Sequence, residues 1–113
     1  MKYTDEQRLE KIIYYTEKLI DYVKDSNITK EMIDEDETIR WTLTTPLYNI
    51  GEHTYNLSDE FRNDHTEIPW AKISGLRHRL VHDYEDTNWS IISDIVFDTL
   101  PEFSKQLELL RNG

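Results

Sequence analysis

At 113 residues, 32% of them charged and 37% apolar, the chain has the size and composition of one domain spanning 1–113. It contains no cysteine, which excludes disulfides and thiolate metal sites, and no apolar run approaches the roughly 20 residues that cross a bilayer. The net charge of −10 argues against a protein that coats nucleic acid through a broad basic surface. Because the N-terminus lacks the basic-then-apolar order of a signal peptide, we expect a cytoplasmic location.

The first predicted helix covers about residues 4–25. Thr4 and Gln7 have the spacing of a capping box, in which each residue satisfies the other's backbone amide. The apolar stripe that follows recurs every three or four residues: Leu9, Ile12, Ile13, Thr16, Leu19, Ile20 and Val23. A single capped turn is predicted at 29–33. The acidic run 34–37 then favours the start of another helix, with a carboxylate metal cluster as the alternative.

The second long helix is predicted from about residue 39 to 57. Pro46 lies inside it and predicts a kink near 44–46, because proline removes a backbone donor and clashes with the preceding turn. Gly51 indicates the close approach of another helix. Residues 58–63 prolong or restart the helix before a loop at 64–67, where His65 has no partner that spacing can name.

Pro69 predicts the first turn of a third helix, since its φ angle is already helical. The core-facing stripe of that helix is Trp70, Ile73, Leu76 or Arg77, Leu80 and Val81. Asn88 is a plausible N-cap for a fourth helix, which Pro101 is predicted to interrupt before a last short helix. No segment alternates with the period of a strand. We therefore expect an all-α, up-down bundle of four long helices with short additions.

Residues 77–84 (RHRLVHDY) gather two arginines, two histidines, an acid and a tyrosine near the end of the third helix. A guanidinium presents a planar fork of donors that matches phosphate oxygens, and imidazole exchanges protons near neutral pH. His78 and His82 share one helix face, whereas Arg77 and His82 lie roughly 140° apart. The latter two side chains can meet at one phosphate only across a groove or where the helix unwinds.

Three interpretations of this segment are open. It is a solvated helix end with an Arg79–Asp83 ion pair, or a metal site using His78 and His82. Alternatively, it cleaves a phosphodiester without metal, using the 2′-hydroxyl of RNA as nucleophile. Arg77 then clamps the phosphate, His82 is the acid or base, and His78 and Arg79 bind substrate. A homodimer with facing motifs would supply a second histidine for the other proton transfer.

The order Arg77, four residues, His82, one residue, Tyr84 resembles the signature of the HEPN superfamily, specifically its HepT-like toxin ribonucleases. Four flanking segments carry the same resemblance over nearly the whole chain: 48–52 (YNIGE), 67–70 (EIPW), 75–77 (GLR) and 98–101 (DTLP). The sequence departs from the family pattern at His78, where such toxins usually carry Asn, and at Pro46, in a helix usually free of proline.

The resemblance implies a helical homodimer whose two motifs line a shared cleft and cleave RNA without metal or another cofactor. It also implies a type VII toxin–antitoxin pair, in which a minimal nucleotidyltransferase transfers AMP from ATP to Tyr84. Adenylate charge beside Arg77 and His82 would repel an RNA phosphate. Two alternatives are a catalytically inactive module that binds the nucleotidyltransferase, and a nucleotide-binding accessory subunit of that enzyme.

Several other residues have two interpretations. Glu52 and His53 are predicted on a polar helix face rather than in a cleft. The three tryptophans are predicted in the core rather than as base-stacking platforms: Trp41, Trp70 and Trp89. Four tyrosines are candidates for a subunit interface: Tyr14, Tyr15, Tyr22 and Tyr48.

Overall fold

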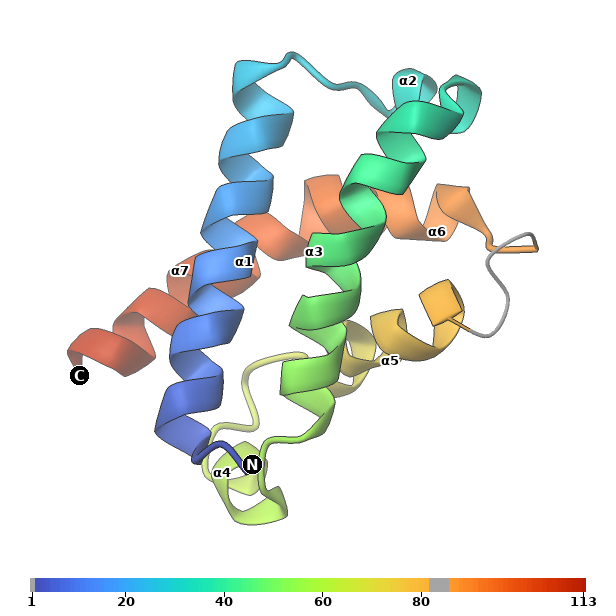
Figure 1. Cartoon of the computed structure of the whole chain (residues 1–113). Helices are drawn as coiled ribbons and strands as arrows, with labels where there is room; N and C mark the ends of the chain where they lie inside the picture. Colours follow the sequence, from blue (N-terminus) through green and yellow to red (C-terminus); the bar gives the residue numbers. More distant parts are fainter. Residues whose placement is uncertain (1, 82–85) are drawn as a thin grey trace.

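The computed structural model describes residues 2–81 and 86–113, and all regular structure in these ranges is helical (Figure 1). The four longer helices are α1 (Asp5–Asp25), α3 (Glu37–Tyr55), α5 (Trp70–Val81) and α7 (Leu100–Asn112). The shorter ones are α2 (Lys30–Glu35), α4 (Asp59–Asn63), α6 (Trp89–Asp94) and the π-helical turn η1 (Ile95–Thr99). The predicted all-α fold is confirmed.

The helix starts follow the predicted caps. The Thr4 hydroxyl accepts from the Gln7 amide, and the Gln7 side chain accepts from the Thr4 amide, so the capping box forms. The Asp36 carboxylate accepts hydrogen bonds from the amides of Thr38 and Ile39 at the start of α3. The acidic run therefore begins a helix, as expected from its place beside the positive end of the helix dipole.

Helix α3 is the central element of the fold, because it packs against α1 on one side and α5 on the other (Figure 1). Helix α7 crosses behind and packs on α1. The fully buried apolar side chains come from all four longer helices and include Ile12, Leu43, Leu47, Ile50, Ile73, Leu76, Leu100, Phe103 and Leu107. This shared core fixes the position of α5, which carries the candidate motif, relative to α3.

The two helical prolines are both accommodated. Helix α3 continues through Pro46. The predicted interruption at Pro101 is wrong, since residues 89–112 are helical throughout. Pro101 lies in the first turn of α7 and, lacking an amide hydrogen, donates no hydrogen bond to the preceding turn. The preceding π turn, in which the Leu100 amide bonds to the Ile95 carbonyl five residues back, connects the two α-helical segments.

The tryptophans divide between core and surface. Trp70 is buried, with its indole Nε1 donating to the His65 carbonyl at 2.9 Å. Trp89 is half-buried. The core prediction for Trp41 is wrong, because 55% of this residue is exposed on the outer face of α3. No helix in the described ranges is long and apolar enough to cross a membrane.

Candidate active site

Arg77 lies where α5 comes closest to α3. A Cβ atom placed on Gly51 of α3 would stand 2.7 Å from the backbone nitrogen of Arg77 and 3.1 Å from Cβ of Leu76. Only glycine permits this approach, so the predicted helix contact at Gly51 is confirmed. The contact brings the Arg77 side chain beside Glu52, the next residue of α3. Arg77 Nε donates to Glu52 Oε2 at 2.6 Å.

Glu52 is itself held by neighbours one turn away on α3. The Tyr48 hydroxyl donates to Oε2 at 3.3 Å, and the Asn56 side-chain amide donates to Oε1 at 3.0 Å. The hydrogen bond from Arg77, with smaller contributions from Asn56 and Tyr48, holds the pKa of Glu52 below its ordinary value, although partial burial opposes the shift. Glu52 is therefore a carboxylate at neutral pH.

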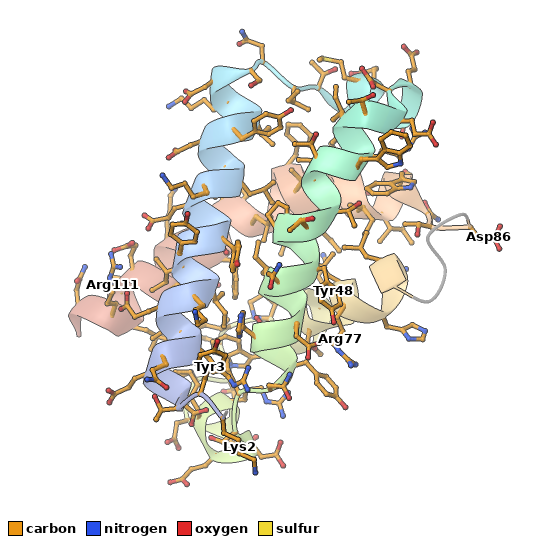
Figure 2. The ribbon with its side chains drawn as sticks, viewed as in Figure 1. Lys2, Tyr3, Tyr48, Arg77, Asp86 and Arg111 are labelled. Carbon is orange, nitrogen blue, oxygen red and sulfur yellow. The ribbon has the colours of Figure 1, made fainter. Side chains whose placement is uncertain are left out.

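The guanidinium of Arg77 is fixed in direction by two contacts. Its Nε is bonded to Glu52, and its Cζ lies 4.3 Å from the centroid of the Tyr55 ring. Figure 2 shows Arg77 and Tyr48 on the same side of α3. Within the described ranges, the two terminal nitrogens of Arg77 make no hydrogen bond. These nitrogens form the part of the fork that can bind two oxygens of one phosphate.

The other predicted site residues lie at the end of α5 or beyond it. His78 and Arg79 are exposed in its last turn. The Arg79 carbonyl accepts from the Thr87 hydroxyl at 2.9 Å, which ties the helix end to the segment that leads into α6. His82 and Tyr84 lie outside the described residues, as does Asp83, the predicted ion-pair partner of Arg79. The alternative metal site at His78 and His82 falls partly outside them for the same reason.

The prediction of a polar helix face is wrong for His53, which is buried against α1 with 9% of its surface exposed. Glu52 does lie on a polar face of α3, beside Tyr48 and Asn56, with 31% of its side chain exposed. The His53 Nδ1 atom lies 3.2 Å from Nη1 of Arg8, and its ring stacks on Tyr15. Burial, followed by the charges of Arg8 and Lys11, holds the pKa of His53 below its ordinary value. A neutral ring can accept the bond from Arg8.

Sequence reasoning missed the residues that orient Arg77. A usable signal existed in α3, where Tyr48, Glu52 and Asn56 recur every four residues and so lie on one face. Tyr55 is seven residues after Tyr48 and falls within about 20° of the same face. The signal is visible only once α5 is known to pack against that face.

An all-α fold that presents an oriented arginine on the helix leading into an Arg-x4-His-x-Tyr segment defines a protein of the HEPN class. A family model described as "Ribonuclease HepT-like" matches residues 7–110. The chain therefore belongs to the HepT-like ribonuclease family.

Curated relatives support the same assignment. A protein of Caldanaerobacter subterraneus subsp. tengcongensis named "Putative RNase TTE0752" is 36% identical over 88% of both chains. "Putative RNase MJ0127" of Methanocaldococcus jannaschii is 32% identical over 80% of this chain and 73% of its own length. "Probable ribonuclease HepT" of Thermococcus cleftensis is 26% identical over 80% of this chain and 94% of its own. No solved structure matches the chain significantly.

Proposed function

We propose that this chain is a metal-independent endoribonuclease and the toxin of a type VII toxin–antitoxin system. The observation that carries the proposal is the oriented Arg77 guanidinium, whose terminal nitrogens are available on the helix that leads into His82. Membership of the HepT-like ribonuclease family and the ribonuclease names of the relatives support it.

The proposed reaction needs proton transfers and charge stabilisation only. The 2′-hydroxyl of RNA attacks the adjacent phosphorus, and the bond from phosphorus to the 5′-oxygen of the next nucleotide breaks. His82 takes the proton from the attacking hydroxyl or gives one to the leaving oxygen. Arg77 stabilises the negative charge that develops on the phosphoryl oxygens. Because Glu52 holds Arg77 in place before substrate arrives, little reorganisation is needed during the reaction.

We also propose a homodimer that uses the outer face of α3. Trp41, Tyr48 and Tyr55 recur every seven residues and form one stripe along the helix, with more than half of Trp41 and Tyr55 exposed. Exposed aromatic side chains are typical of subunit interfaces. Arg77 packs on this stripe through Tyr55, so a second copy on the same face would bring two motifs together and supply a second His82.

The purified chain is expected to cleave RNA in the presence of EDTA, to leave DNA of the same sequence intact, and to produce cyclic phosphate ends. DNA lacks the 2′-hydroxyl that serves as nucleophile. His82→Ala should abolish cleavage while circular dichroism and the particle mass from light scattering remain those of the wild type. Absence of cleavage of any RNA would favour an inactive binding module, and cleavage that requires an added metal ion would contradict the proposed chemistry.

The proposed partner is a minimal nucleotidyltransferase that adenylylates Tyr84. Co-expression with the nucleotidyltransferase encoded beside this chain is expected to increase its mass by whole numbers of adenylate units and to suppress RNA cleavage. The added phosphates would repel RNA from Arg77 and His82. Tyr84→Phe should stay unmodified and active, with Tyr55→Phe as the matched control that is still modified. Modification of the Tyr84→Phe chain would show that another residue is the acceptor.

A further inference from the structure

A second cationic cluster lies on the opposite side of α3 from Arg77. Lys11 Nζ and Arg8 Cζ, both from α1, lie 4.8 Å and 5.4 Å from the centroid of the Tyr3 ring. Arg8 also bonds to the buried ring of His53, and that ring packs edge-on against Tyr3 at 5.7 Å between centroids. Helix α3 thus carries a contact to one cation at Glu52 and to another at His53, the very next residue.

The two cations of this cluster have no acidic partner in the part of the chain that the structure describes. Arg8 and Lys11 are held instead by aromatic rings and a neutral histidine, which leave their charge uncompensated. Two cations beside the same aromatic ring attract an anion.

Beside the cluster is a hollow of about 340 Å³ in which an anion could sit. It is lined by Tyr3, Gln7, Glu10 and Lys11. The one carboxylate in this lining, that of Glu10, lies 3.6 Å from the guanidinium of Arg111. Arg111 also pairs with Glu108, at 2.8 Å, so Glu10 shares this cation, and Lys11 is the cation in the lining of the hollow.

We propose that Lys11, with Arg8 beside the same Tyr3 ring, is a phosphate-binding subsite for the backbone of the RNA substrate, away from the cleaved linkage. This inference rests on the proposed function. Figure 2 shows Tyr3 and Arg77 on either side of the C-terminal half of α3. A helix with its side chains is about 10–12 Å across, a span that a few nucleotides of single-stranded RNA cover. One strand of RNA held at Arg77 is therefore long enough to reach Lys11.

The test measures binding of a fluorescent single-stranded RNA to the full-length His82→Ala chain, which keeps the substrate intact, at several salt concentrations. Adding Lys11→Gln is expected to weaken binding several-fold and to reduce the slope of log affinity against log salt by about 0.7, the contribution of one phosphate contact on a single strand. Lys11→Arg should restore the slope. Lys105→Gln, which removes the same charge from α7, is the matched control and should change neither quantity.

The outcomes separate this inference from the proposed function. If the His82→Ala chain binds RNA and Lys11→Gln behaves like Lys105→Gln, the subsite is wrong and the ribonuclease proposal stands. If the His82→Ala chain binds no RNA and the wild type cleaves none, both fail. ATP and inorganic phosphate are titrated in parallel. Lys11-dependent binding of ATP, without an effect on RNA, would assign the cluster to a free nucleotide and overturn the RNA assignment.

Discussion

Arg77→Ala is expected to slow RNA cleavage by about two to three orders of magnitude, the usual loss when one donor to a developing negative charge is removed. Arg77→Lys should also be severely impaired. An ammonium cannot donate to Glu52 and at the same time present a planar fork to two phosphate oxygens. Single-turnover rates with saturating RNA measure the effect. The Arg77–Glu52 pair is only partly buried, so both variants should remain folded by circular dichroism.

Substitutions of Glu52 test the orientation of Arg77 more specifically, because Glu52 is expected to act on the reaction only through Arg77. Glu52→Ala should lower the single-turnover rate by about tenfold to a hundredfold, since a displacement of about 1 Å at a reacting centre can cost a factor of 100. Glu52→Gln, whose amide oxygen can still accept from Arg77 Nε, should recover much of the loss. In an Arg77→Ala background, Glu52→Ala should have no further effect.

Two results would contradict this role for Glu52. Equal losses from Glu52→Ala with and without Arg77 would mean that the carboxylate acts independently of the guanidinium. A loss that appears only in KM, with the saturated rate unchanged, would mean that Glu52 affects RNA binding and not the orientation of the group that stabilises the reaction.

The helical scaffold could be predicted from sequence because its signals are local. Capping depends on residues three positions apart, as at Thr4 and Gln7, and the apolar stripes depend on steps of three and four. Trp41 shows the limit of such reasoning. Its apolar character is compatible with a buried face, but only the packing of α1 and α5 decides which face of α3 stays uncovered. Pro101 shows a second limit of such reasoning. The π turn at Ile95–Thr99, which lets the helix continue past this proline, has no sequence signal that periodicity detects.

The candidate site was only half predictable for a related reason. Arg77 and His82 are close in sequence and could be recognised as a motif. Glu52 is 25 residues from Arg77, and their contact depends on the register between α3 and α5. Periodicity predicts which face of each helix is buried, but it does not predict how far α5 is shifted along α3. That translation is fixed by Gly51, where the backbone of α5 comes too close for any side chain.

Gly51→Ala is therefore expected to destabilise the protein by about 1–3 kcal/mol, the typical cost of overpacking a close contact. The new methyl group would meet the Arg77 nitrogen at 2.7 Å and the Ile73 carbonyl at 3.3 Å, both backbone atoms of α5. These atoms can move only if the two helices separate. Such a separation outweighs the roughly 1 kcal/mol that alanine gains over glycine in a helix. Urea unfolding at one protein concentration measures the change.

Gly75→Ala is the matched control for this substitution. Gly75 also lies within a helix, but a Cβ atom there meets nothing within 4 Å, so only the helix preference should act and stability should rise by about 0.5–1 kcal/mol. Opposite signs at the two glycines would show that the contact at Gly51 sets the spacing of α3 and α5. Equal stabilisation would show that the helices can part without cost.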